Sequence, residues 1–318
     1  MKIRFGFVAH ALPLWNASPA KTLTFTRYAK MTKTERHEKL LEVTASNLRH
    51  TKRILFYCAA HEVPLYRLSS SLVPLATHPE VLWDFVTPFQ NEWEELGRLI
   101  RSFSMRVSFH PSQFTLFTSP KKDITDNSIR DMDYHYRMLK AMGMEKEATM
   151  NIHIGGAYGD KQKTLVNFHQ NLSRLPQSIH SVMTLENDDK TYNAIETLTA
   201  CKKEGIPMVF DLHHHLANPS PNELDTFLSD ILDTWSHMPH PPKIHLSSPK
   251  DEKAFRSHAD YVDLEFIRPF FLQLKSIGRN VDFMIEAKAK DLAMFKLIEE
   301  LSSIRGVKRM NGGTLEWN

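Results

Sequence analysis

Six short apolar segments of the chain end in a residue type that binds metal ions. Their last residues are Phe109-His110, Ile152-His153, Leu185-Glu186, Phe210-Asp211, Ile244-His245 and Ile285-Glu286. A single histidine or carboxylate after an apolar run is usually a cap or a loop residue. Six in succession favour metal binding, because burying so many ionisable groups together without a cation would cost many kcal/mol.

The candidate ligands outnumber what a single ion needs. With His214 and His258 added, the set becomes His110, His153, Glu186, Asp211, His214, His245, His258 and Glu286. A zinc ion typically takes about three or four protein ligands, and Glu186 and Asp211 lie centrally enough to bridge ions. We therefore expect two or three divalent ions, an arrangement that clamps the attacking and leaving oxygens in phosphodiester hydrolysis. The mixture of imidazole and carboxylate suits Zn²⁺ or Mn²⁺ better than Ca²⁺.

These segments belong to a longer alternation of strands and helices. Strands are expected at 3–8, 64–69, 106–110, 149–153, 181–186, 207–211, 242–246 and 281–286, and helices near 34–61, 89–104, 127–142, 161–174, 191–204, 221–235, 261–276 and 288–304. Such alternation indicates parallel strands with crossover connections. We predict one TIM-barrel domain over residues 1–318, with the ligands on the rim where barrel active sites lie. An open doubly wound sheet is the alternative, although no G-x-G-x-x-G fingerprint follows the first strand.

Local signals predict where several helices begin. Thr32 followed by Glu35 fits a capping box. The segment Ser220-Pro221-Asn222-Glu223 fits another, with proline at the first helical position. Asp160 and Asp260 are the predicted N-caps of two further helices.

Composition and charge are those of an ordinary globular protein. The chain is 42 % hydrophobic and 24 % charged, and its net charge of +3 permits a nucleic-acid partner without requiring one. Cys58 and Cys201 are expected to be buried free thiols. The N-terminal segment has a strand pattern rather than that of a signal peptide, and no apolar run approaches the roughly 20 residues that span a membrane. We expect a cytoplasmic monomer without membrane contact.

Seven stretches of the sequence resemble the UV damage endonucleases, DNA-repair enzymes related to endonuclease IV and built on a TIM barrel. The stretches are HPSQF at 110–114, NIHIGGAYGDK at 151–161, LENDD at 185–189, FDLHHHLANP at 210–219, KIHLSS at 243–248, SHAD at 257–260 and MIEAK at 284–288. They occur in the family's order and spacing. The resemblance implies a three-metal site and incision of the phosphodiester immediately 5′ to cyclobutane pyrimidine dimers and 6-4 photoproducts, with abasic sites as a secondary substrate.

The resemblance also implies how the ligands are shared among the ions. One ion would be held by His110, His153 and Glu186, a second by Glu186, Asp211, His245 and Glu286, and a third by His214 and His258. Mn²⁺ is the expected ion, with Zn²⁺, Mg²⁺ or Co²⁺ as alternatives. A bound water of lowered pKa would then attack phosphorus in line, so that no Ser or Cys nucleophile is needed.

Two further residues match the family's active site and join Glu186 as candidate catalytic residues. Lys243 lies two residues before His245, so both side chains face the same side of the strand. Family members look to carry a carboxylated, metal-bridging lysine here, and the alternative is an ordinary lysine that contacts phosphate or a carboxylate. His78 matches a histidine near the family's active site, and the alternative is a structural loop histidine.

The residues that would read the damage depart from the family's pattern. The family has a Gln-Tyr probe after the third strand, whereas this chain has Gln113-Phe114. Phenylalanine can still wedge into the base stack, although it has no hydroxyl group to donate. Phe7 stands where relatives look to have tyrosine, and its alternative role is core packing. Phosphate contacts are expected from a basic collar of lysines near the rim, namely Lys121, Lys122, Lys161, Lys288 and Lys290.

Three other functions compete with this interpretation. A sugar isomerase of related barrel architecture would also hold two metals at its strand ends, but the 17 histidines and the Gln-Phe pair argue against it. An abasic-site endonuclease without photoproduct specificity would need the same ligands. A catalytically silent DNA-binding or scaffold protein is disfavoured, because an idle cluster of buried charges is costly.

Overall fold

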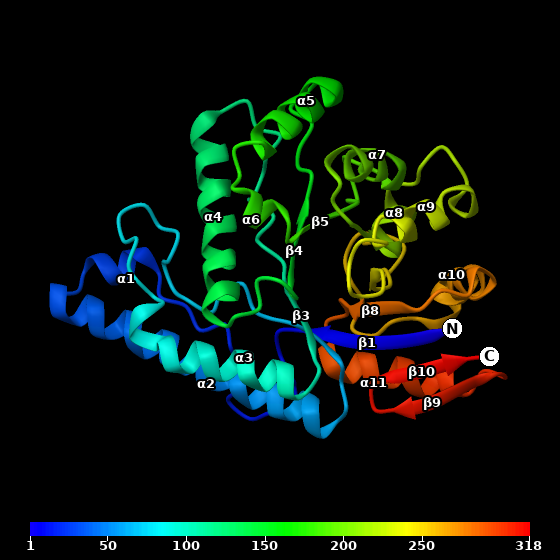
Figure 1. Cartoon of the computed structure of the whole chain (residues 1–318), viewed down its shortest axis with the longest axis horizontal. Coiled ribbons are helices and arrows are strands. Elements are labelled where there is room, and N and C mark those ends of the chain that lie inside the picture. The colour runs from blue at the N-terminus through cyan, green and yellow to red at the C-terminus, as the bar shows by residue number, and fades with distance from the viewer.

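The computed structural model describes all 318 residues and contains a closed barrel of parallel strands. The strands are β1 (Lys2–Val8), β2 (Leu65–Arg67), β3 (Arg106–Phe109), β4 (Thr149–His153), β5 (Met183–Glu186), β6 (Met208–Asp211), β7 (Lys243–Leu246) and β8 (Val281–Ile285). They pair in sequence order, and β1 closes the ring by pairing with both β8 and β2 (Figure 1). The predicted TIM barrel is confirmed, and the open sheet is excluded because the barrel has no free edge.

Closure of the barrel depends on the close approach of β1 and β2 at Gly6. Gly6 pairs with Leu65, and a Cβ atom at position 6 would lie 2.4 Å from the Cβ of Leu65. No side chain fits at that separation, so only glycine allows the two strands to pair there.

A C-terminal hairpin that we did not predict extends the sheet at the start of β1. Strands β9 (Val307–Asn311) and β10 (Thr314–Trp317) form the hairpin, and residues 2–4 of β1 pair antiparallel with β10. Leu315 and Trp317 are buried in the core. The hairpin covers one edge of β1 where β2 does not reach.

The longer helices lie outside the barrel, near the predicted positions. They are α2 (Lys33–Ala60), α3 (Gln90–Ser102), α4 (Lys122–Ala141), α5 (Lys161–Leu172), α7 (Ala194–Glu204), α10 (Leu264–Ile277) and α11 (Lys290–Ser302). Short helical segments interrupt the connections: α1 (Phe25–Ala29), η1 (Thr87–Phe89), α6 (Gln177–His180) and α8 (Leu212–Ala217). The long helix predicted at 221–235 is wrong, because that segment forms only η2 (Leu224–Thr226) and α9 (Leu228–Asp233). None of the helices combines the length and apolar character needed to cross a membrane.

Two of the predicted helix starts are confirmed. At the start of α2, the Glu35 amide donates to Thr32 Oγ1 at 3.3 Å and the Thr32 amide donates to Glu35 Oε2 at 2.7 Å. Asp160 caps α5 by accepting a hydrogen bond from the Lys163 amide at 3.0 Å.

The other two predicted starts are wrong because tertiary contacts use those residues elsewhere. The Ser220 hydroxyl accepts a hydrogen bond from the Ile195 amide in the first turn of α7, at 3.2 Å, and no helix begins at 221. Helix α10 begins three residues later than expected, so Asp263 caps it instead of Asp260.

The lower part of the barrel interior holds an ion network in place of the branched aliphatic residues usual in TIM barrels. Asp282 is fully buried and accepts hydrogen bonds from Arg4 at 2.6 Å and Arg106 at 2.5 Å. Lys243 is 3 % exposed and lies opposite Asp282 in the register of β7 and β8. The network therefore places three basic side chains, Arg4, Arg106 and Lys243, around one carboxylate.

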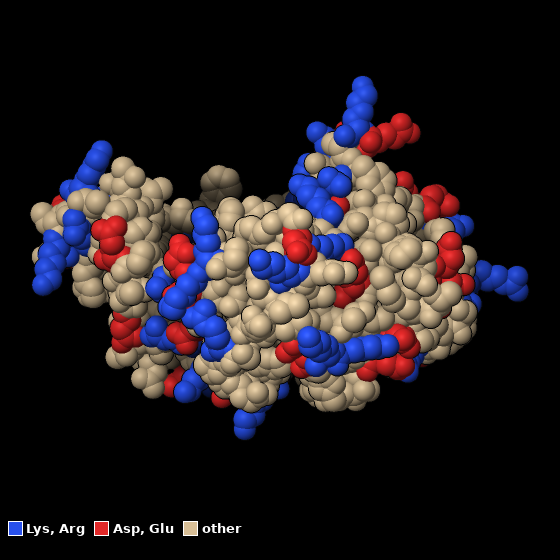
Figure 2. Space-filling model, turned by 90° about the horizontal axis from the view of Figure 1, so that it is seen from above, with Lys and Arg blue, Asp and Glu red and all other residues tan.

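Surface charge and thiols follow the expectations from composition. The face drawn in Figure 2 intersperses Lys and Arg with Asp and Glu, without a continuous patch of one sign. Cys58 and Cys201 are both free and buried, as predicted.

Candidate metal centre

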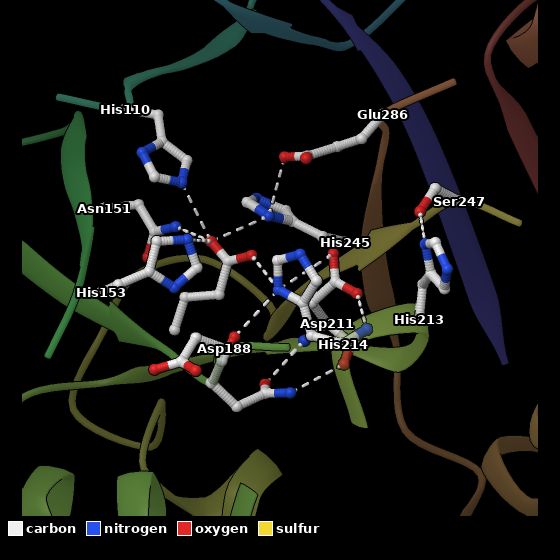
Figure 3. Close-up of polar contacts among 12 residues, drawn as sticks. His110, Asn151, His153, Asp188, Asp211, His213, His214, His245, Ser247 and Glu286 are labelled. Atoms are coloured by element: carbon white, nitrogen blue, oxygen red, sulfur yellow. Dashed lines mark hydrogen bonds and ion pairs between the residues drawn. The ribbon is translucent and has the colours of Figure 1, made fainter. Parts of the chain in front are cut away.

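The strand-end ligands converge because the register of the barrel brings them level. His153 pairs with Glu186, and Asp211 pairs with His245. In Figure 3 the labelled side chains of His110, His153, His214, His245 and Glu286 point toward one another. Three ligand sets have atoms within 4.8 Å of one another: His110, His153 and Glu186; Glu186, Asp211 and His214; and Glu186, His245 and Glu286.

Glu186 is the hub of the centre, because it belongs to all three sets. Its carboxylate is fully buried. Oε2 lies 3.1 Å from Nε2 of His110 and 3.1 Å from Nδ1 of His245, and Oε1 lies 3.4 Å from Nδ1 of His214. Glu186 therefore lies at the centre of the cluster, and its bridging of ions stays a prediction.

Several buried ligand atoms make no hydrogen bond, which tests whether this donor set fits metal ions. They are Glu186 Oε1, Asp211 Oδ2, His153 Nδ1 and His245 Nδ1. Buried polar atoms without partners cost free energy. Divalent ions would satisfy the lone pairs of carboxylate oxygens and neutral imidazoles. The donor set therefore fits two or three such ions.

Backbone carbonyl groups orient three of the histidines. Nδ1 of His110 lies 3.0 Å from the Pro111 oxygen, Nδ1 of His214 lies 3.0 Å from the Asn187 oxygen, and Nδ1 of His258 lies 2.6 Å from the Glu286 oxygen. Metal-binding histidines commonly donate one ring N–H in this way, which leaves Nε2 as the ligand.

The grouping differs from the expected division among ions. Asp211 lies with Glu186 and His214 rather than with His245 and Glu286. His258 belongs to none of the three sets, and its ring centroid is 6.3 Å from that of His214. Its role as a ligand stays a prediction.

Only one member of the consecutive histidine triplet belongs to the site. His213 points away from the cluster in Figure 3, and its Nδ1 lies 2.8 Å from the Ser247 hydroxyl. His215 packs against Phe210 with ring centroids 5.5 Å apart. Their neighbour His214 faces the cluster because Asp211 caps α8 and accepts the His214 amide at 2.8 Å.

Three supporting residues were missed in the sequence. Arg67 forms an ion pair with Glu286, and Asn151 donates to Glu186 Oε2. The side-chain amide of Asn187 donates to the Asp211 carbonyl and accepts from the Asp211 amide, both at 2.9 Å. The period of two along β4 would have indicated Asn151, because it precedes His153 by two residues.

The candidate catalytic residues His78 and Lys243 lie outside the three ligand sets. His78 is half-buried in the loop after β2 and stacks on Phe25, with ring centroids 4.0 Å apart. Lys243 lies below the cluster, where burial and the neighbouring Arg106 guanidinium hold the pKa of its amine well below the usual value. Catalytic roles for both residues stay predictions.

Of the three residues expected to read the lesion, one is buried and two are exposed. Phe7 is fully buried, with its ring 6.4 Å from Tyr57 of α2 and 5.6 Å from Tyr66. The expectation that it contacts DNA is wrong, because it points between the barrel and the helices. Gln113 is exposed, and Phe114 is 74 % exposed on the loop after β3.

Only some lysines of the basic collar are both exposed and without an ion-pair partner. Lys161 lies 2.6 Å from Glu196, and Lys122 lies 2.7 Å from Asp126. Lys290 is half-buried, and burial and Arg67 lower the pKa of its amine. Lys121 and Lys288 are exposed. Lys161 would have to leave its carboxylate partner in order to contact phosphate.

The charges of the cluster stabilise protonated imidazoles while no ion is bound. Burial lowers the pKa of His245, but Glu186 and Glu286 raise it to about 9 overall. Burial also opposes protonation of His214, whereas Asp211 and Glu186 raise its pKa to about 11. For Glu186, burial raises the pKa, yet His245 and His153 hold it well below its usual range. Metal binding must therefore displace protons from these histidines.

We expect Mn²⁺ binding to release about one to two protons per protein at neutral pH. Apparent affinity should rise between pH 6 and about 9, the pKa of His245. Titration calorimetry in two buffers of different ionisation enthalpy counts the protons. In EDTA, the stability that His245 contributes is complete below its unfolded pKa near 6.5 and is lost as pH rises through about 9. A pH-independent Mn²⁺ affinity over this range would contradict the protonated cluster.

Fold and site together define a TIM-barrel enzyme with a candidate metal centre at its strand ends. The model of the family described as UV-endonuclease UvdE matches residues 3–318. A UV DNA damage endonuclease of Bacillus pumilus (strain SAFR-032) is 60 % identical over 318 residues, covering 100 % of this chain and 99 % of the relative. The chain belongs to the UvdE family, and it is therefore a DNA endonuclease.

Solved structures agree with this assignment. The crystal structure of SacUVDE matches with a TM-score of 0.84 at 29 % identity, covering 94 % of this chain and 98 % of that one. A D-tagatose 3-epimerase-like protein matches with a TM-score of 0.53 at 15 % identity, covering 94 % of this chain and 96 % of that one. The second likeness shows the shared fold alone. Family membership decides against the sugar-isomerase and scaffold alternatives.

Proposed function

We propose that this endonuclease cuts the phosphodiester bond immediately 5′ to UV photoproducts in double-stranded DNA. The substrates would be cyclobutane pyrimidine dimers and 6-4 photoproducts, with abasic sites as a secondary substrate. The observation that carries the proposal is the trio of ligand sets sharing Glu186, beside a loop that exposes Phe114. The first feature suits phosphodiester hydrolysis, and the second suits recognition of a disturbed base stack.

In this proposal the metal ligands hold the ions, and neighbouring residues orient the ligands. The ligand sets would hold two or three divalent ions, with Mn²⁺ as the expected ion. When bound, the ions would supply a nucleophilic water and neutralise charge on the phosphate, leaving a 3′-hydroxyl and a 5′-phosphate. Arg67 orients Glu286, and Asn151 orients Glu186. Such outer contacts keep ligands in place and exclude other rotamers.

The loop after β3 is suited to probe the base stack because its backbone is anchored. The Leu116 amide donates to Ser128 Oγ at 2.8 Å, and Asn171 donates to the Phe117 carbonyl at 2.8 Å. A rigid support lets Phe114 insert into DNA without first being ordered, which lowers the entropic cost of binding. Gln113 beside it would contact the opened bases.

We include carboxylation of Lys243 in the proposal. The buried amine is disfavoured as a cation beside Arg106, and a neutral amine can add CO₂ and release one proton to become a carbamate. Arg106 has two buried nitrogens, Nε and Nη2, without hydrogen-bond partners. An anionic group on Lys243 would offset the excess of buried positive charge in this layer.

Nicking of supercoiled plasmid tests the proposed function. We expect irradiated plasmid to be nicked in Mn²⁺ far faster than unirradiated plasmid, and EDTA to abolish the nicking. Equal nicking of irradiated and unirradiated plasmid would contradict the proposed function. Duplexes with one dimer or one abasic site then separate this function from the second candidate, an abasic-site endonuclease that ignores photoproducts.

Variants in the same assay test the two residues outside the ligand sets. Lys243→Met should slow nicking strongly if the carbamate is needed, and added bicarbonate should not restore it. His78→Ala should also slow nicking if His78 acts in catalysis. If either variant nicks irradiated plasmid at the wild-type rate, the residue that it replaces is not catalytic.

A further inference from the structure

The loop between β4 and α5 holds an exposed aromatic ring on a strained backbone. Tyr158 is 50 % exposed, and its φ of +46° lies in the left-handed region that bulky residues avoid. Glycine would adopt this conformation without strain, as Gly159 does next to it with a φ of +85°. A tyrosine at this position is therefore not explained by folding of the loop. Strained residues of this kind cluster at functional sites.

The Tyr158 ring has a defined support. A Cβ atom at Gly156 would lie 3.6 Å from Cε2 of Tyr158, in ordinary van der Waals contact. The Cδ2–Cε2 edge of the ring therefore lies beside Gly156, while half of the residue stays exposed to solvent. The ring is available for a partner that offers a flat surface.

The Tyr158 loop and the Phe114 loop pack directly against each other. A Cβ atom at Gly155 would lie 2.6 Å from Thr118 Oγ1 and 3.3 Å from Leu116 Cδ2, which leaves no room for a side chain. Phe114 and Tyr158 thus belong to two loops that are joined near their bases.

Both loops start from ligands of the metal centre. His110 precedes Phe114 by four residues, and His153 precedes Tyr158 by five. The rings of His110 and His153 are 5.3 Å apart. The two exposed aromatic residues are therefore held on the same side of the rim as the candidate site of hydrolysis.

We propose that Tyr158 is a second base-stacking residue, which works with Phe114 to hold the opened DNA at a lesion. This inference rests on the proposed function. Bases that a lesion or a wedge has unstacked expose a π-face, and aromatic side chains bind such faces whatever the base. With Phe114 inserted at the lesion, Tyr158 would cover a base that loses its neighbour, so that specificity for distorted DNA would come from two rings.

Incision kinetics with a duplex carrying one dimer test this role in the Mn²⁺-loaded enzyme. Tyr158→Ala should lower kcat/KM about 10- to 100-fold, as expected for the loss of one stacked base, whereas Tyr158→Phe should stay within about 3-fold of wild type. Phe56→Ala is the matched control, because Phe56 is 48 % exposed on α2 and packs on Phe103, away from both loops. An unchanged Tyr158→Ala enzyme, or a Tyr158→Phe enzyme as impaired as Tyr158→Ala, would overturn the inference.

Two further readouts separate stacking from a structural role. Tyr158→Gly removes the ring and the strain together, so it should lose activity like Tyr158→Ala but melt no lower than the wild type. A clearly lower melting temperature would assign Tyr158 to folding and overturn the inference. In stopped-flow mixing with 2-aminopurine opposite the dimer, the fluorescence rise before incision should be larger with Tyr158→Ala, because no ring quenches the base. An equal rise in both enzymes would also overturn it.

The plasmid assay separates the failure of this inference from that of the proposed function. If wild type does not prefer irradiated plasmid, the proposed function fails. If it does and Tyr158→Ala behaves as wild type, only the role of Tyr158 fails.

Discussion

Replacing Glu186 with glutamine is expected to abolish incision. Glu186 is the one residue shared by all three ligand sets, so its loss removes a ligand from every ion at once. An amide binds divalent ions more weakly than a carboxylate and removes one of the counter-charges of the surrounding imidazoles. We expect incision of irradiated plasmid to fall on the order of 10³-fold or more.

Metal content and activity measured together test the role of Glu186. Elemental analysis after dialysis should show fewer bound ions in Glu186→Gln than in wild type. Glu265→Gln is the matched control, since Glu265 is an exposed carboxylate on α10 that pairs with Arg268 at 2.8 Å, and it should retain full activity and metal content. A Glu186→Gln enzyme with more than about a tenth of wild-type activity would show that no ion depends on this carboxylate.

Replacing Asp282 with asparagine should lower the free energy of unfolding more than replacing an exposed, ion-paired aspartate. Asp282 is the only carboxylate that contacts the guanidinium groups of the buried Arg106 and the partly exposed Arg4, and Lys243 lies opposite it. Removing one partner of a buried ion pair leaves uncompensated charge and costs about 3–5 kcal/mol. We expect the free energy of unfolding to fall by roughly that amount.

Urea denaturation of the metal-free protein measures this change without interference from bound ions. Asp230→Asn is the control, because Asp230 pairs with Lys202 at 2.7 Å where both side chains are about half exposed. An exposed pair contributes at most about 1 kcal/mol, so this variant should unfold nearly as wild type does. If Asp282→Asn loses no more than Asp230→Asn, the buried network does not stabilise the fold.

The sequence predicted the barrel and the types of its ligands well because both depend on local patterns. Each parallel strand ends on the same rim of a barrel, so a ligand type that follows an apolar run is enough to place His110, Glu186 or Asp211. Capping residues such as Thr32 are equally local, because the hydrogen bonds they make span three residues.

The failures arose where distant contacts override local patterns. Ser220 caps no helix of its own, because its hydroxyl binds the Ile195 amide from α7. The β9–β10 hairpin was missed, since its stability comes from pairing with β1 at the other end of the chain. Phe7 was assigned to DNA because it matches a tyrosine of the family, and that match does not reveal which way its side chain points. Its ring packs on Tyr57, outside the barrel.

In the metal centre, too, local patterns predicted some features and distant contacts decided the others. By itself the sequence determined that imidazoles and carboxylates meet at one rim, because residue type and spacing along the chain suffice for that. Only the tertiary structure decided that Glu186 is common to every ligand set, that Asp211 lies with His214, and that Arg67 supports Glu286. Those relations depend on strand register around a closed barrel, and register is set by contacts between residues far apart in sequence.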